Sequence, residues 1–214
     1  MEKGGNMAAI EQKRTSRGRP QRTEKQIQQM REKISASALR LFQDEGYEAI
    51  SMRRVAQEAG LTPMTLYKYF DSKIDILRSL WSEIFSVLFD ELDQIATKEP
   101  DPRARINAMA LRYVTYWLDN PEHYFLVFMS KGIKQIDVRG FVESDTIMAR
   151  FDVLSSGLAK ALGDGVDQHE QRLKSELQLC ALNGIAHNLI TISSYPWSAP
   201  ERLVRIAISG LLEA

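Results

Sequence analysis

The sequence predicts an all-α protein in which a small N-terminal three-helix unit precedes a larger helical body. Apolar residues recur at helical spacing along most of the chain, and a capping residue or a proline precedes nearly every such run. No segment shows the sustained alternation that is typical of a strand. With 214 residues, of which 44% are hydrophobic, the chain can bury a substantial core.

These patterns divide the chain into three segments. Residues 1–22 lack periodicity and are rich in Gly, Lys and Arg, which predicts a disordered basic tail. Residues 23–71 should form the three-helix unit, of the helix-turn-helix type, and residues 72–214 the helical body.

The first two helices are defined by their ends. Thr23 and Gln26 have the spacing of a capping box, and helical periodicity then continues until Gly46. Ser51 is placed to cap the second helix, and Gly60 supplies a stop that is compatible with positive φ.

A third helix is predicted for the stretch LTPMTLYKYF, residues 61–70. Thr62 can cap a free amide, and Pro63 suits the first helical position. On a helical wheel, one side carries the apolar pair Leu66 and Phe70. The opposite side and its flanks carry Met64, Thr65, Tyr67, Lys68 and Tyr69. A polar and aromatic face behind a glycine turn is typical of a recognition helix that enters the DNA major groove.

The body should contain six further helices. Ser72 and Asp75 have the spacing of another capping box, at the start of a long helix that ends near Ala96. The next two helices open with cap-plus-proline pairs, Asp101 with Pro102 and Asn120 with Pro121. Three more are expected at about residues 143–162, at about residues 167–193 and after Pro200.

The charges are distributed unevenly, although the formal net charge is zero. Residues 1–70 carry thirteen Lys and Arg against eight Asp and Glu, whereas residues 71–214 carry fifteen against twenty. A basic head on an acidic body favours nucleic-acid binding by the head. The alternative is a basic tail that only aids solubility.

Several classes of protein are disfavoured by what the sequence lacks. The single cysteine, Cys180, and the three histidines do not have zinc-finger spacing, so we expect no metal and no cofactor. The N-terminus does not resemble a signal peptide, and no apolar run approaches about 20 residues, which predicts a cytoplasmic protein without a membrane partner. The sequence contains no HExxH, GxSxG, GxxxxGK[ST] or GxGxxG motif, so we do not expect an enzyme.

Residues 25–77, and above all GYEAISMRRVAQEAGLTPMTLYKYFDSKIDIL, resemble the DNA-binding domain of the tetracycline-repressor (TetR) family of bacterial transcription regulators. The resemblance is carried by Phe42, Gly46, Tyr47, Ser51, Val55, Ala56, Ala59, Gly60, Thr65, Leu66, Tyr67, Phe70 and Lys73. The remaining chain is similar only in the number and lengths of its helices. The resemblance implies a DNA-binding domain over residues 23–71 and an effector-binding and dimerisation domain over residues 72–214.

The resemblance also implies individual roles at the DNA. Ser51, Tyr67 and Lys73 would contact phosphates, and Arg53 would reach a base or a phosphate. Thr65, Lys68 and Tyr69 would face the groove. Met64 stands where some relatives carry a hydrogen-bonding side chain, so base recognition would depend on Arg53, Thr65 and Lys68.

Three assignments have simpler alternatives. Arg17 and Arg19 could enter the minor groove as part of a basic arm, or they could belong to a plain tail. Arg54 could be a solvated charge, and Tyr67 could belong to the core.

The last two helices predict a two-fold homodimer. Small residues allow helices to approach closely, and an apolar C-terminal face could complete a four-helix interface between two copies. The residues of this interface are Leu177, Cys180, Ala181, Gly184, Leu203 and Ile206. The alternative is that the stripe around Cys180 belongs to the internal core. A dimer carries two recognition helices and therefore requires a palindromic operator in double-stranded DNA.

An effector pocket in the body is implied by the family resemblance together with the long helix that joins the two units. An unknown, largely apolar small molecule would bind there and move the recognition helices. Its lining would come from Met109, Tyr113, Tyr116, Trp117, Phe125, Phe128, Met129, Met148 and Phe151, with Asn183 and His187 as polar contacts.

The function expected from the sequence is therefore a sequence-specific transcriptional regulator, most simply a repressor. An activator is equally compatible with the residues, because the sign of regulation depends on operator position. Two other classes remain as alternatives, a helical protein-interaction scaffold and a nonspecific architectural DNA binder. The acidic body argues against the architectural binder, whose surface should be basic throughout.

Overall fold

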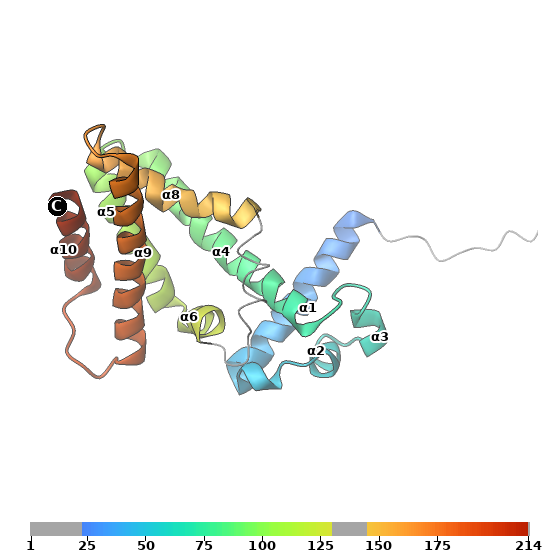
Figure 1. Cartoon of the computed structure of the whole chain (residues 1–214). Coiled ribbons are helices and arrows are strands. Elements are labelled where there is room, and N and C mark those ends of the chain that lie inside the picture. Colours follow the sequence, from blue (N-terminus) through green and yellow to red (C-terminus); the bar gives the residue numbers. More distant parts are fainter. Residues whose placement is uncertain (1–22, 130–144, 214) are drawn as a thin grey trace, which may run out of the picture.

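The structure, a computed structural model, describes residues 23–129 and 145–213, with the side chains of residues 145–149 excepted. The described part contains helices and no strand, which confirms the predicted all-α class. Figure 1 shows a small group of helices at one end of a long central helix and a larger group at its other end. Arg17 and Arg19 lie outside the described residues, as does the Met148 side chain.

The helices follow in chain order. They are α1 (Glu24–Glu45), the 3-10 turn η1 (Tyr47–Ala49), α2 (Met52–Glu58), α3 (Pro63–Leu66), α4 (Lys73–Lys98), α5 (Pro102–Asp119), α6 (Pro121–Phe128), α8 (Asp145–Leu162), α9 (Gln168–Thr191) and α10 (Pro200–Glu213). Helix α9 ends at Thr191, two residues before the expected end near residue 193. The expected start near residue 143 lies outside the described residues.

Most of the predicted helix starts are confirmed by their hydrogen bonds. Thr23 and Gln26 form the complete capping box, and the side chains of Ser51, Thr62, Ser72 and Asp101 each accept a bond from the first turn that follows. Asn120 is the exception, because its amide Nδ2 donates 2.8 Å to the Tyr116 carbonyl oxygen instead of capping α6.

The third helix is shorter than the ten residues expected. After α3 ends at Leu66, the chain continues in tight turns in which the Lys68 amide donates to the Thr65 carbonyl and the Tyr69 amide to the Leu66 carbonyl. Such i→i+3 bonds tighten the chain at a helix end. Tyr69 and Phe70 at the end of this segment are both buried, as the wheel predicted for Phe70.

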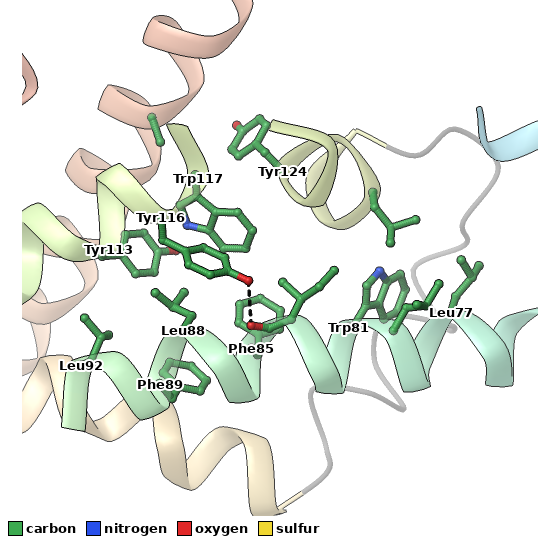
Figure 2. Close-up of a cluster of buried hydrophobic side chains, with 14 of the residues drawn as sticks. Leu77, Trp81, Phe85, Leu88, Phe89, Leu92, Tyr113, Tyr116, Trp117 and Tyr124 are labelled. Atoms are coloured by element: carbon green, nitrogen blue, oxygen red, sulfur yellow. Dashed lines mark hydrogen bonds between the residues drawn. The ribbon is translucent and has the colours of Figure 1, made fainter. Parts of the chain in front are cut away.

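The central helix α4 packs in both groups of helices. Near its start, Ile76 and Leu77 are buried in the same core as the residues of α1 and α2. Further along, its buried residues meet the aromatic side chains of α5, as Figure 2 shows for Phe85 and Trp117. Because both groups share α4, the domain boundary at residue 71 stays a prediction.

The far half of the body surrounds α5. Helices α8, α9 and α10 all pack against it, and Arg150 of α8 adds ion pairs of 2.7 and 3.0 Å to Asp90 and Asp93 of α4. In the two described ranges, no helix combines the length and the apolar character needed to cross a membrane.

Candidate nucleic-acid interface

The turn between α2 and α3 is formed by a glycine with a left-handed backbone. Gly60 has φ +69°, and the amides of Gly60 and Leu61 donate back to the carbonyls of Gln57 and Ala56. Leu66 is fully buried beside Val55 and Ala56. This packing fixes how α3 lies on α2, which is the arrangement that a helix-turn-helix requires.

Most of the predicted outer face of α3 is exposed. Met64 is 78% exposed and Tyr67 is 53% exposed, and Lys68 is also open to solvent. Thr65 is half-buried, and its hydroxyl lies 2.9 Å from the hydroxyl of Thr62. Since Tyr67 lies at the surface, the alternative that it belongs to the core is wrong.

Tyr69 does not face outward as the family resemblance implied. Its side chain is only 6% exposed, and the Arg31 guanidinium donates to its carbonyl oxygen while lying 4.1 Å from the centre of the Phe70 ring. The helical wheel placed Tyr69 on a flank, but α3 ends at Leu66 and the chain continues in turns. Tyr69 therefore belongs to the core that supports α3.

The start of α2 presents a hydroxyl and a cation. Ser51 Oγ accepts the Arg54 amide at 3.3 Å, which leaves its own proton available for a phosphate oxygen. Arg53 is exposed and belongs to none of the ion pairs among the described side chains. Arg54 is about half exposed and makes two hydrogen bonds to the Glu45 carboxylate, which lower the pKa of Glu45.

Lys73 lies half-buried at the start of α4. Its Nζ donates 3.1 Å to the Tyr47 carbonyl oxygen and lies 3.6 Å from the centre of the Tyr47 ring. This position lowers the pKa of Lys73 through burial. Two of the three ammonium protons remain for a phosphate, so the predicted contact is compatible with this arrangement. The sequence did not reveal the pairing with Tyr47, which is 26 residues away.

Four of the predicted effector residues are core side chains in this structure. Met109, Tyr113, Tyr116 and Trp117 are all buried, and the Trp117 ring contacts Phe128 with 5.2 Å between centroids. The other expected aromatic and sulfur side chains of α6, Phe125 and Met129, are exposed. Phe151 packs on α4 instead, 5.3 Å from Phe85 and 4.8 Å from Phe89. Met148 cannot be placed, because its side chain is outside the described residues.

The two predicted polar residues of α9 each bond to a tyrosine of this cluster. The Tyr113 hydroxyl donates 2.7 Å to Asn183 Oδ1, and the Tyr124 hydroxyl lies 2.9 Å from His187 Nδ1. Burial raises the pKa of Tyr113, so that its hydroxyl stays a donor. Sequence reasoning missed Tyr124, whose position within the aromatic run of α6 was its only signal.

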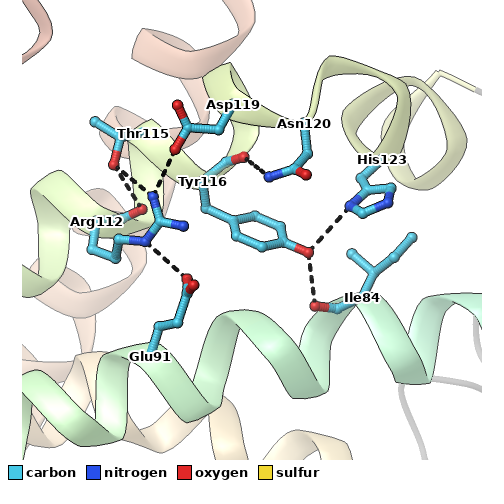
Figure 3. Close-up of polar contacts among 8 residues, drawn as sticks. All are labelled: Ile84, Glu91, Arg112, Thr115, Tyr116, Asp119, Asn120 and His123. Atoms are coloured by element: carbon cyan, nitrogen blue, oxygen red, sulfur yellow. Dashed lines mark hydrogen bonds and ion pairs between the residues drawn. The ribbon is translucent and has the colours of Figure 1, made fainter.

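A second polar cluster joins α4, α5 and α6 (Figure 3). The Tyr116 hydroxyl lies 3.2 Å from both the Ile84 carbonyl oxygen and His123 Nδ1. If it donates its one proton to the carbonyl, His123 must donate from Nδ1. Beside it, Arg112 donates 2.8 Å to Glu91 and 2.9 Å to Asp119. These contacts hold α5 and α6 against α4.

The predicted dimer residues lie on the surface of α9 and α10. Leu177 is 58% and Ile206 61% exposed, and Cys180 is also exposed, so this stripe is not internal core in the single chain. Ala181, Gly184 and Leu203 are half-buried. A groove of about 330 Å³ runs between the two helices, and its lining includes Leu177, Ala181 and Ile206.

The N-terminal unit matches a known family of proteins. Residues 34–80 match the family described as "Bacterial regulatory proteins, tetR family". Over 141 residues, 66% of the chain, the sequence is 29% identical to the transcriptional repressor KstR of Mycolicibacterium smegmatis. It is 24% identical over 146 residues to the transcriptional activator FasR of the same species. The matched regions span 67% of KstR and 64% of FasR.

The whole fold is also found among solved structures. The structure of FadR from Bacillus subtilis in complex with stearoyl-CoA covers 85% of this chain and 97% of its own, with a TM-score of 0.68 and 15% identity. At this identity the likeness concerns the fold alone.

The two tyrosines that follow Leu66 provide a test of this interface. Tyr67→Phe should weaken DNA binding about tenfold if the exposed hydroxyl contacts a phosphate, as the family resemblance implies. Tyr69→Phe should change the affinity by less than about twofold, because Tyr69 is buried. Fluorescence anisotropy with labelled duplex DNA measures both affinities. Equal losses in the two variants would contradict this orientation of the segment.

Proposed function

We propose that this chain, which belongs to the TetR family of DNA-binding transcriptional regulators, is a repressor that a small apolar effector releases from a palindromic operator. The observation that carries the proposal is the exposed surface of α3 and of the turn that follows it, formed by Met64, Tyr67 and Lys68 around a buried Leu66. A face of this kind can enter the major groove while the helix stays anchored.

The exposed side chains suggest how bases and phosphates would be contacted. Lys68 and Arg53 can donate to guanine O6 and N7, and the Met64 thioether can contact a thymine methyl group. Thr65 has less freedom, because its hydroxyl is close to Thr62. Ser51 and Tyr67 would hold phosphates.

A homodimer is supported by the apolar groove between α9 and α10. Leu177 and Ile206 are more than half exposed, and such side chains at one groove favour burial by a second copy. Two copies related by two-fold symmetry would present two α3 helices. Their operator would have half-sites separated by about 34–36 Å.

The aromatic cluster around Trp117 supports the effector part of the proposal. It combines packed rings with two buried polar pairs, Tyr113 with Asn183 and Tyr124 with His187. An effector would have to enter by displacing rings of α6, where Phe125 and Phe128 are partly exposed. The stearoyl-CoA bound to the solved FadR makes a long acyl chain the first candidate.

Repression is favoured over activation, because the chain is 29% identical to the repressor KstR and 24% identical to the activator FasR. The activator FasR is the basis of the alternative. A reporter gene under the selected operator distinguishes them, since deletion of a repressor raises expression and deletion of an activator lowers it.

Lys68 provides the test of base recognition. After selection of an operator from random duplexes, Lys68→Ala should lose about 1–3 kcal/mol of operator binding and much of the preference over random DNA. Lys98→Ala serves as the control, because this exposed lysine ends α4 far from α3. Gel-shift titrations at fixed salt measure both. Loss of operator and random DNA binding by the same factor would contradict base recognition by Lys68.

The dimer can be tested with two matched isoleucines. Ile206→Glu places a charge in the groove and should give a monomer at micromolar concentration. Ile192→Glu makes the same change at the end of α9, outside the residues of the groove, and should leave the dimer intact. Light scattering reports the mass. A wild-type protein that is monomeric under these conditions would disprove the dimer.

The effector proposal predicts thermodynamic coupling between ligand and DNA. Stearoyl-CoA should bind about 5–150-fold more weakly when the operator is present, because DNA and effector favour different states. His187→Ala should weaken the ligand, whereas His169→Ala, which changes an exposed histidine of the same helix, should not. Calorimetric titrations with and without operator measure both effects. Equal ligand affinities in the two titrations would exclude control of operator binding by stearoyl-CoA.

A further inference from the structure

A groove of about 340 Å³ lies where α1, α4, α5 and α6 meet. It is lined by Leu39 of α1, by Leu80, Glu83, Ile84, Val87 and Glu91 of α4, and by Arg112, Tyr116, Asn120 and His123 of the following helices. Figure 3 shows its polar end, with Tyr116 between Ile84 and His123. Of the residues predicted for the effector pocket, only Tyr116 is shared with this groove. The groove is therefore a separate candidate site.

One wall of the groove is apolar. Leu39 and Leu80 stand beside Ile84 and Val87, and Val87 is 52% exposed although it lies next to the core. An exposed aliphatic side chain of α4 next to buried neighbours offers a surface that an apolar ligand group can cover.

The charges at the groove are predominantly negative. Glu83 takes part in no ion pair between described residues, and the polar partners of its carboxylate are the neutral hydroxyls of Ser35 and Ser79. The guanidinium of Arg112 is the one formal cation in the lining, and two carboxylates, Glu91 and Asp119, already neutralise it. A cationic ligand would therefore meet an unpaired carboxylate, whereas an anionic ligand would meet no unpaired cation.

Neighbouring groups strengthen this bias. Partial burial of its carboxylate raises the pKa of Glu83, and the nearby Glu32 adds to this, while hydrogen bonds with Ser35 and Ser79 act in the opposite direction. Burial lowers the pKa of His123, so its ring is neutral near pH 7 and does not offset the carboxylates, although Glu122 acts in the opposite direction. A cation bound at Glu83 would offset the electrostatic repulsion between Glu83 and Glu32, and this would add to its affinity.

We propose that the groove between Leu39, Val87, Glu83 and Tyr116 binds a lipophilic organic cation, with the cationic group at Glu83 and the apolar part against α4 and Leu39. Its volume is at the lower end of the range of about 300–1,000 Å³ that is typical of ligand sites, which suits a quaternary ammonium with one medium-length chain.

A metal ion fits the groove less well. In the part of the chain that the structure describes, no three His, Cys, Asp or Glu residues come together as a possible metal site. Metal ions of the Mg²⁺ and Ca²⁺ type require several oxygen ligands, whereas Glu91 is already paired with Arg112 and four of the ten lining residues are aliphatic.

The position of the groove would allow such a ligand to influence the DNA-binding unit. Leu39 belongs to α1 of that unit and His123 belongs to α6 of the body, so one ligand would contact both groups of helices. An effect on transcription rests on the proposed function, but binding itself does not. For this reason the test measures ligand binding in the absence of DNA.

The probe is decyltrimethylammonium, titrated into the full chain by calorimetry well below its micelle concentration. We expect saturable binding to the wild type, and binding at least about fivefold weaker to Glu83→Gln. Asp164→Asn removes an exposed carboxylate from the turn before α9 and should change the affinity by less than about twofold. Decanoate, with a chain of the same kind and the opposite charge, should bind at least about tenfold more weakly than the cation.

A second variant tests the location independently of charge. Val87→Trp fills the exposed wall of the groove and should abolish saturable binding, with thermal unfolding used to verify that the variant is folded. Wild-type affinity in either Glu83→Gln or Val87→Trp, or equal binding of decanoate, would overturn the proposal. Operator titrations on the same samples report separately on the proposed function, so a failure of one can be distinguished from a failure of the other.

Discussion

The fold depends on the continuous burial of one face of α4. Nine side chains along this helix are buried, from Ile76 near its start to Leu92 near its end, and they pack first with α1 and then with α5 and α8. Protein interiors are close-packed, so neither end of such a helix can shift without a response in the helices around it. A regulator that links two distant sites needs a stiff element of this kind, and α4 packs in both groups of helices.

Polar contacts hold α4 on both of its flanks and limit the directions in which it can move. Tyr116 reaches the Ile84 carbonyl from α5, and Arg150 of α8 binds Asp90 and Asp93 on another side. The Tyr116 contact is buried, and burial raises its pKa to about 12, so the hydroxyl remains a hydrogen-bond donor at any ordinary pH. In the Arg150 pairs both carboxylates are more than half exposed, so these pairs contribute less stability than the buried Tyr116 contact. Phe151 of α8 also packs on Phe85 and Phe89, so apolar contacts hold α4 on this side as well.

The sequence was informative where structure is local and failed where it depends on distant partners. Helix starts such as Thr62 with Pro63 were correct because a cap uses only the next few residues. The orientation of Tyr69 was wrong because the helix ends at Leu66 and the chain then continues in turns, where Tyr69 is buried in the core. The contact of Lys73 with Tyr47 and that of His187 with Tyr124 span 26 and 63 residues, and no periodicity in the sequence encodes such pairs.

The turn at Gly60 has a consequence for how this protein can vary over evolution. A Cβ placed there would meet no other atom within 4 Å, so space does not restrict the position. The restriction is the left-handed backbone, which costs an ordinary L-residue about 1–2 kcal/mol. No compensating change in a neighbouring side chain can remove that cost, because no neighbouring side chain causes it. Substitutions of Gly60 should therefore be rare in functional descendants, whatever mutations accumulate around it.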